Sequence, residues 1–403
     1  MADRALREID LEGGPVTVVG ALDFDRTPTG ISPRRLPDWT RPQIPDLFMH
    51  SMVGMGSGVR LSFTTDADLV ELDVLVTGFR VVGTTASKPV FQLVSNAADG
   101  TADGVRSVRT EVADDYQRFV LDHADPLNVG FEPGEPATIR FAGLGDATKV
   151  VELWLPHAAS TELRALRIPA DATASPTAPS GRPRWLHYGS SISHCMEAET
   201  PTEIWPAVAA TAAGVDLFSL GLAGQCQLDQ FVARTIRDLR ADVISLKVGI
   251  NIVNGDVMRE RAFVPAVHGF LDTVREGHPD TPILVVSPIF CPSAEDTPGP
   301  TLMAADGGFD TVGGMEAIRS GCLTLRRIRE LLAEIVAGRV ERGDGHLAYL
   351  DGLALFGADD ASDLPDRLHP NNAGYARMGT RFAALAFGDS GGLHRQRLLP
   401  LQP

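Results

Sequence analysis

The sequence predicts two domains, an all-β sandwich followed by an α/β domain built on a parallel sheet. At 403 residues the chain is too long for one ordinary domain. Its first 168 residues contain short apolar segments separated by glycines, whereas its second half alternates short apolar runs with longer amphipathic ones. A segment rich in proline, alanine, serine and threonine separates the two patterns.

The first pattern is typical of antiparallel strands, because short apolar segments recur at close spacing and long helical patterns are absent. Turn-forming glycines stand between these segments. We therefore expect residues 1–168 to form an all-β sandwich of the jelly-roll-like kind. Examples of the expected strands are residues 59–64, 69–76, 90–95, 137–142 and 150–155.

Residues 169–183 read PADATASPTAPSGRP, with too little apolar surface to form a core, and they predict an extended linker. The α/β domain should then span residues 184–388, with a tail at 389–403. Alternating strands and helices indicate a parallel sheet with helices on both faces. We expect strands at 185–188, 215–220, 243–248, 283–287 and 347–350, and helices at 203–213, 228–240, 263–276, 315–342 and 373–386.

The composition excludes several classes of function. A formal net charge of -16 repels phosphate backbones, so nucleic acid is not an expected partner. No apolar run reaches the length of a membrane span, and the first residues do not have the pattern of a secretory signal. The four cysteines form no C-x-x-C pair, so free thiols and a cytoplasmic location are expected. The oligomeric state is not predicted.

The residues that follow the predicted strands carry the chemistry, because ligands of parallel sheets bind beyond the carboxyl ends of the strands. Gly189-Ser190-Ser191-Ile192 joins a strand to a helix, and a serine there exposes its hydroxyl and backbone N–H at the helix start. By itself this segment also fits an ordinary turn.

A second pattern lies near the other end of the chain, at Asp366-Arg367-Leu368-His369. An aspartate three residues before a histidine can bring its carboxylate to one ring nitrogen and leave the other free as a general base. Two further strand ends carry Gly221-Leu222-Ala223-Gly224 and Gly249-Ile250-Asn251. Glycine N–H groups and an asparagine amide at such positions are potential oxyanion donors.

These four segments, in this order, resemble the signature blocks of the SGNH/GDSL hydrolase family, named for its Ser, Gly, Asn and His residues. The resemblance covers about residues 184–388 and implies a flavodoxin-like sheet. It also implies a triad of Ser191, Asp366 and His369, with an oxyanion hole formed by Ser191, Gly224 and Asn251. Two positions depart from the usual blocks. Ser190 replaces the common aspartate, which resembles the G-x-S-I branch and argues against a lipid substrate, and Ile252 follows Asn251 where an aspartate is frequent.

The resemblance implies no organic cofactor and no metal. His187, His194 and Cys195 flank the nucleophile segment, but their spacing fits no common zinc pattern. Trp205 and Asn254 can line a pocket, although packing or helix capping explains them equally well. Residues 290–314 form a long loop rich in glycine and proline, which we interpret as a lid or substrate wall.

The leading hypothesis for function is a serine esterase that hydrolyses short or otherwise small acyl esters of a small molecule or carbohydrate. An acyltransferase with the same triad is the first alternative, because water and an alcohol can compete for one acyl-enzyme. The sandwich resembles the extra domain of some carbohydrate esterases and natural-product acyltransferases. A non-catalytic carbohydrate-binding protein is the second alternative.

Overall fold

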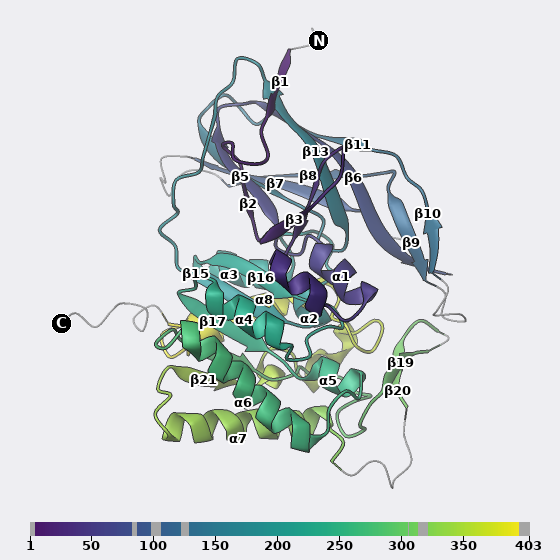
Figure 1. The fold of residues 1–403 in the computed structure, drawn as a ribbon, viewed down its shortest axis with the longest axis vertical. Helices are drawn as coiled ribbons and strands as arrows, with labels where there is room; N and C mark the ends of the chain where they lie inside the picture. Colours follow the sequence, from purple (N-terminus) through teal and green to yellow (C-terminus); the bar gives the residue numbers. More distant parts are fainter. Residues whose placement is uncertain are drawn as a thin grey trace, which may run out of the picture. The chain divides into compact units, whose positions relative to one another are not determined.

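The computed structural model describes residues 5–82, 87–97, 106–121, 129–304, 306–312 and 321–394. The chain divides into two compact units (Figure 1). The first, called here the all-β unit, comprises Met1–Gly181 with Glu199–Thr202. The second, the α/β unit, comprises Arg182–Ala198 with Glu203–Pro403.

The all-β unit contains two sheets. The larger has the order β10-β9-β6-β13-β4-β3, with β1 paired to β13 and β11 paired to β6, and the smaller has the order β14-β5-β12-β7-β8, with β2 paired to β5. The larger sheet consists of β1 (Leu6–Ile9), β3 (Asp23–Arg26), β4 (Ile31–Arg34), β6 (Leu69–Val81), β9 (Gln117–Leu121), β10 (Val129–Glu132), β11 (Ala137–Ala142) and β13 (Ser160–Pro169). The smaller consists of β2 (Thr17–Val19), β5 (Arg60–Thr65), β7 (Val90–Ala97), β8 (Ser107–Val112), β12 (Lys149–Trp154) and β14 (Ala174–Ser175).

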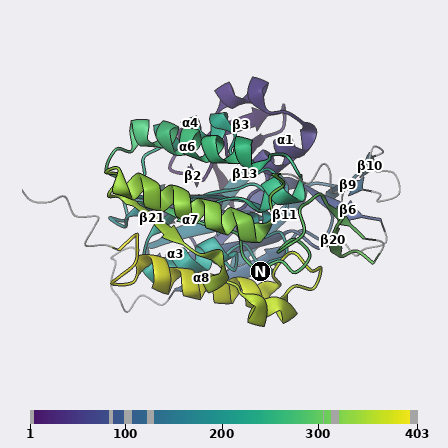
Figure 2. The same ribbon diagram turned by 90° about the horizontal axis from the view of Figure 1, so that it is seen from below.

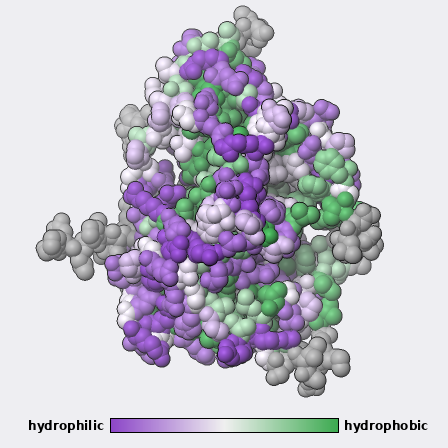
Figure 3. Space-filling model, in the orientation of Figure 1, coloured by the Kyte–Doolittle hydropathy of each residue, from purple (hydrophilic) through white to green (hydrophobic). Residues whose placement is uncertain are grey.

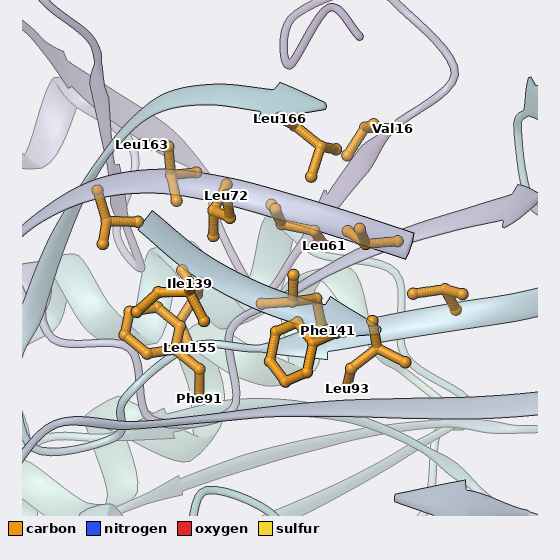
Figure 4. Close-up of a cluster of buried hydrophobic side chains, with 14 of the residues drawn as sticks. Val16, Leu61, Leu72, Phe91, Leu93, Ile139, Phe141, Leu155, Leu163 and Leu166 are labelled. Atoms are coloured by element: carbon orange, nitrogen blue, oxygen red, sulfur yellow. The ribbon is translucent and has the colours of Figure 1, made fainter. Parts of the chain in front are cut away.

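The core of this unit lies between the two sheets. Side chains alternate along β11, where Ile139 and Phe141 are buried and the residues between and beside them are exposed. Figure 4 shows these two side chains next to Phe91 and Leu93 of β7, which belongs to the other sheet. Since one face of each sheet supplies this core, the expected sandwich is confirmed.

Three features of the all-β unit were not predicted. A short helix, α1 (Leu47–Gly54), begins at Asp46, whose side chain accepts a hydrogen bond from the Met49 N–H. A 3₁₀ helix, η1 (Asp38–Gln43), precedes it. The expected linker also contains β14, which pairs with β5 through the backbone. Composition did not reveal this strand because backbone pairing needs no apolar side chain.

The α/β unit is built on a five-stranded parallel sheet in the order β16-β15-β17-β18-β21, and this confirms the predicted fold class. The order is that of a flavodoxin-like sheet, which places the carboxyl ends of β15, β16 and β17 side by side. The strands are β15 (Arg184–Gly189), β16 (Asp216–Gly221), β17 (Val243–Lys247), β18 (Ile283–Val286) and β21 (Leu347–Leu350).

Helices cover both faces of this sheet. α3 packs against α8, α4 packs against α6, and α7 packs on α6 and β21. Figure 2 shows α3 and α8 on one side of the unit and α4 and α6 on the other. The helices are α2 (Ser191–His194), α3 (Trp205–Ala213), α4 (Gln230–Asp238), α5 (Ile250–Asn254), α6 (Glu260–Gly277), α7 (Leu325–Glu341) and α8 (Asn372–Phe387), with 3₁₀ helices η3 (Gly352–Ala354) and η4 (Ala358–Asp363).

The helix predicted at 315–342 is shorter in the structure. Its residues 315–320 lie outside the described part of the chain, and α7 begins after Thr324, whose side chain accepts a hydrogen bond from the Arg327 N–H. This threonine is a helix-capping residue, which the apolar periodicity did not reveal. None of the helices in the described residues is long and apolar enough to span a lipid bilayer.

Candidate active site

The nucleophile segment is held against the sheet by two glycines. β15 ends at Gly189, Ser190 caps the single turn of α2, and Ser191 is its first residue. A Cβ at Gly189 would lie 2.2 Å from Ser193 Oγ, and one at Gly221, the last residue of β16, would lie 2.6 Å from the backbone N of His194. These close approaches need glycine, so the two strand ends fix where Ser191 sits.

A buried histidine lies beneath this turn. His187, on β15, has no exposed surface, and its ring nitrogens lie 2.7 Å from Ser245 Oγ and 2.8 Å from Ser193 Oγ. Burial, with the nearby Lys247 charge, lowers the pKa of His187 to about 3, so the ring is neutral. A neutral imidazole donates through one nitrogen and accepts through the other, so it satisfies both hydroxyls. His187 therefore acts as a structural link between β15, β17 and α2.

The predicted base contacts Ser191 directly. His369 Nε2 is 3.0 Å from Ser191 Oγ, and His369 Nδ1 is 2.7 Å from Asp366 Oδ2. The other oxygen of Asp366 accepts the backbone N–H groups of Leu368 and His369. With the Nδ1 proton donated to Asp366, Nε2 is left to accept the Ser191 hydroxyl proton.

The surroundings of Asp366 and His369 favour an ionised Asp366 and a protonated His369. Burial alone raises the pKa of Asp366, but hydrogen bonds from His369 and from backbone N–H groups outweigh it and hold that pKa below its usual range. Burial lowers the pKa of His369, but the charges of Glu197 and Asp366 outweigh this effect and raise that pKa to about 8. The site therefore stabilises a protonated His369, the form that follows removal of the serine proton.

Sequence reasoning missed Glu197. Its Oε1 lies 3.5 Å from His369 Nδ1, and its Oε2 accepts a hydrogen bond of 2.7 Å from the Tyr375 hydroxyl. The residue follows α2 in a loop, and Tyr375 comes from α8, so no local pattern connects them. The two chain positions come together only in the folded unit.

The predicted oxyanion residues lie at neighbouring strand ends. The Leu222 N–H donates to the Gly189 carbonyl at 2.8 Å, which ties the loop containing Gly224 to the nucleophile segment. Asn251, at the start of α5, is buried, and its Oδ1 accepts the Cys226 N–H at 3.0 Å. This bond orients the side chain so that its NH₂ group remains as the donor. Hydrogen bonds thus connect the nucleophile segment to the glycine segment and to His369, and they connect Asn251 to Cys226, two residues after the glycine segment.

Part of the long loop predicted as a lid or substrate wall forms a hairpin. It consists of β19 (Thr301–Met303) and β20 (Phe309–Thr311). The Phe309 N–H donates to the Asp366 carbonyl at 2.9 Å, and the Phe309 ring meets the His369 ring edge-on, 5.5 Å between centroids. Arg367, which follows Asp366, forms ion pairs with Asp306 and Asp310 of the hairpin.

The hairpin is apolar on its outside. Two apolar side chains of β19 are exposed, Leu302 by 54% and Met303 by 37%, and Val312, which directly follows β20, is exposed by 47%. Figure 3 shows an apolar patch over β19 and β20. Through Phe309 the hairpin places an apolar ring beside His369, and this contact supports the interpretation of the loop as a substrate wall.

Other residues considered from the sequence have structural contacts. Trp205 is fully buried, its indole N–H donates to the Ile192 carbonyl, and it packs on His187, so packing rather than pocket lining explains it. Asn254 accepts a hydrogen bond from Thr301 and so anchors β19. Cys195 is buried, and burial raises its pKa well above the usual value, which makes it an unreactive thiol.

Among the described residues, one cluster has side chains with the right chemistry for a metal ion, namely Glu197, Asp366 and His369. The ring of His369 is engaged on both sides, at Nδ1 with Asp366 and at Nε2 with Ser191. A metal ion bound here would have to displace the Nδ1 proton from its hydrogen bond to Asp366. The cluster fits proton transfer better than metal binding.

Residues 187–377 match the model of the GDSL-like lipase/acylhydrolase family. This match contains all four segments, namely those of Ser191, Gly224, Asn251 and His369. No protein with a curated description matches the chain in sequence.

Solved structures resemble this chain over most of its length. A salicylyl-acyltransferase, SsfX3, from a tetracycline biosynthetic pathway matches with 26% identity and a TM-score of 0.75, over 94% of this chain and 96% of that one. A Bacteroides ovatus protein described as a GDSL-like lipase matches with 19% identity and a TM-score of 0.64, over 94% and 96%. A family two carbohydrate esterase from Clostridium thermocellum matches with 13% identity and a TM-score of 0.56, over 92% and 96%. The last two similarities establish the fold alone.

Proposed function

Because this chain belongs to the SGNH/GDSL hydrolase family, whose members act on ester bonds, we propose that it is a serine esterase that releases a short or small acyl group. Its substrate would be an ester of a small molecule or a carbohydrate. The observation that carries the proposal is the continuous hydrogen-bonded path from Ser191 through His369 to Asp366, with distances of 3.0 and 2.7 Å.

In the proposed reaction, Ser191 Oγ attacks the ester carbonyl while His369 Nε2 removes its proton. Asp366 fixes the tautomer of His369 and stabilises the imidazolium. The Oγ–carbonyl bond forms, the ester C–O bond breaks, and His369 returns the proton to the leaving alcohol. Water then attacks the acyl-enzyme by the same route, which releases the acid and restores Ser191.

The developing negative charge on the carbonyl oxygen needs donors that are already in place. We assign this role to the N–H groups of Ser191 and Gly224 and to the Asn251 side-chain amide. Burial of Asn251 and its fixed Oδ1 contact with the Cys226 N–H support the assignment, because a donor that is already oriented needs no reorganisation during the reaction.

An acyltransferase is the second candidate, and one observation favours it. The salicylyl-acyltransferase SsfX3 resembles this chain over nearly its whole length, with the all-β unit included. In that case a bound alcohol would attack the acyl-enzyme in place of water, with His369 taking the proton of the alcohol.

The first test is hydrolysis of p-nitrophenyl esters, from acetate to long acyl chains, by the wild type, Ser191→Ala and Ser193→Ala. Ser193 is a matched control because it lies on the same helix and also bonds to a histidine. We expect Ser191→Ala to lose about 10³-fold or more of kcat, and Ser193→Ala to stay within about tenfold of the wild type.

Undiminished turnover by Ser191→Ala would refute the proposed nucleophile. Product analysis with added alcohols separates the two candidates, because new esters in place of free acid indicate an acyltransferase. The non-catalytic binding protein would be favoured by two results together. The wild type would show no ester turnover, and the Ser191→Ala variant would still bind a glycan.

A further inference from the structure

The base of the proposed triad faces two carboxylates rather than one. Asp366 accepts the hydrogen bond from His369 Nδ1, and Glu197 Oε1 lies 3.5 Å from the same nitrogen. Asp366 belongs to the same segment as His369, whereas Glu197 comes from the loop after α2. Neither the family's signature blocks nor the local sequence pattern assigns Glu197 a role.

Glu197 is held in place by a buried tyrosine. The Tyr375 hydroxyl donates to Glu197 Oε2 at 2.7 Å, and Tyr375 has no exposed surface. Burial, together with the charge of Glu197, raises the pKa of Tyr375 well above its usual value, so the hydroxyl keeps its proton and remains a donor. The second oxygen of Glu197 is thereby turned toward His369.

We propose that Glu197 is a positioning residue that acts through His369, where it provides a second negative charge for the imidazolium and is itself oriented by Tyr375. The inference rests on the proposed esterase or acyltransferase reaction, in which His369 becomes protonated as Ser191 attacks. A negative charge that is already in place lowers the energy of that protonated state without any movement of the protein.

The charges around His369 determine what pH dependence to expect. Among the described residues, Asp366 and Glu197 are the charged groups that face its ring. Ser191 and the Phe309 ring are uncharged, and Arg367 is engaged by Asp306 and Asp310 in the hairpin. With both carboxylates present, the pKa of His369 is about 8. Because the reaction needs neutral His369, kcat/KM should rise with pH and reach half of its plateau near that pKa.

Solvent limits the size of the effect. The Glu197 side chain is 32% exposed, so its interaction with His369 is screened in part. We therefore expect removal of the Glu197 charge to lower the pKa of His369 by about half a unit to one unit. The stabilisation lost from the protonated state corresponds to a fall of about three- to tenfold in the alkaline plateau of kcat/KM.

The decisive experiment compares pH–rate profiles of the wild type and Glu197→Gln. Glutamine keeps the shape and can still accept the Tyr375 hydrogen bond, so only the charge is lost. We expect a lower alkaline plateau and an acid limb displaced to lower pH, so that the variant and the wild type have about the same kcat/KM at pH 6. Glu197→Asp should restore the limb in part, and Tyr375→Phe should shift it in the same direction by a smaller amount. Glu341→Gln, at an exposed position in the last turn of α7, controls for loss of one negative charge and should leave the profile unchanged.

Titration of His369 in ¹⁵N-histidine-labelled protein, followed by NMR, provides a readout that does not need turnover. Its signal can be assigned by its absence from His369→Gln. A His369 pKa and an acid limb that are both unchanged in Glu197→Gln would overturn the inference. If the wild type hydrolyses no ester or Ser191→Ala remains active, the proposed function fails, and the NMR titration still tests the Glu197–His369 interaction.

Discussion

The α2 turn carries two serine–histidine pairs that differ in what stands behind the histidine. Ser193 contacts His187 at 2.8 Å, and Ser191 contacts His369 at 3.0 Å. Behind His187 is the Ser245 hydroxyl, whereas behind His369 are the carboxylates of Asp366 and Glu197. The two serines lie two residues apart on one helix, and each contacts a histidine. The histidine of Ser193 is backed by a neutral hydroxyl, whereas that of Ser191 is backed by two carboxylates.

The pKa values express this difference. Burial lowers the pKa of both histidines, but the carboxylates reverse the effect at His369, so that its pKa is about 8, against about 3 for His187. A histidine without a carboxylate can orient a hydroxyl but is a poor acceptor of its proton. The comparison indicates that the anions, rather than the serine–histidine contact itself, make a general base.

Among the changes that test this comparison, the largest effect is expected from one that displaces the helix shared by both pairs. In Gly221→Ala the new Cβ would meet the His194 N and Ser193 carbonyl carbon at 2.6 Å, and these are backbone atoms that cannot rotate away. We expect α2 to shift and kcat/KM for a p-nitrophenyl ester to fall by about 10²- to 10³-fold. Gly269→Ala is the matched control, because nothing lies within 4 Å of its added Cβ and the helix α6 gains an alanine. Unchanged turnover in Gly221→Ala would show that the strand end does not fix Ser191.

The second test removes the structural histidine. His187→Ala leaves a cavity and two buried hydroxyls that lose a partner, so we expect a loss of about 2–4 kcal/mol in the free energy of unfolding, measured with urea. His346→Ala, at an exposed position, should change it by less than about 0.5 kcal/mol. A loss as small as that of the control would contradict a structural role for His187.

The same variant tests the sign of the pKa shift. The pKa of His187 is lower in the folded protein, about 3, than its ordinary value of 6.5, so the unfolded chain binds the extra proton between these values. Its contribution to stability is therefore complete above about pH 6.5 and is lost as pH falls toward 3. Unfolding of His187→Ala should depend less steeply on pH in this window than unfolding of the wild type.

The sequence was sufficient for features that depend on local pattern. Apolar runs followed by glycine or polar residues identified the strand ends that carry Ser191, Gly221 and Asn251. An aspartate three residues before a histidine identified the segment of Asp366 and His369. In the structure these segments meet because a doubly wound sheet brings the carboxyl ends of its strands to one edge.

Contacts that depend on side-chain packing between distant segments were not predictable. Glu197 and Tyr375 are 178 positions apart, and nothing in the sequence distinguishes Glu197 from Glu199 or Glu203 nearby. His187 looked like a residue beside the nucleophile, but its partner Ser245 depends on the register of β15 and β17, in which the two residues are paired. A single sequence does not contain this register explicitly.

The smallest effect is expected where the charges are exposed. Arg367 follows Asp366 and pairs with Asp306 and Asp310, and the side chains of these three residues are 38%, 64% and 58% exposed. Solvent screens such pairs, so Arg367→Ala should change Tm by no more than about 2 °C. The backbone of residue 367 has a positive φ of 67°, which alanine tolerates no better than arginine, so the substitution tests the side chain alone.

The hairpin would still be attached after this change through the Phe309 N–H and the Asp366 carbonyl. We therefore expect a fall of about two- to fivefold in kcat/KM, mainly through KM, because a looser wall beside His369 binds the ester less well but leaves the proton path intact. Arg326→Ala is the control, since its exposed pair with Asp296 has similar geometry and lies outside the Asp366–His369 segment. Equal kinetics in both variants would mean that the hairpin is not a substrate wall. A fall in kcat at constant KM would instead mean that Arg367 affects the proton path of Asp366 and His369 rather than the binding of the ester.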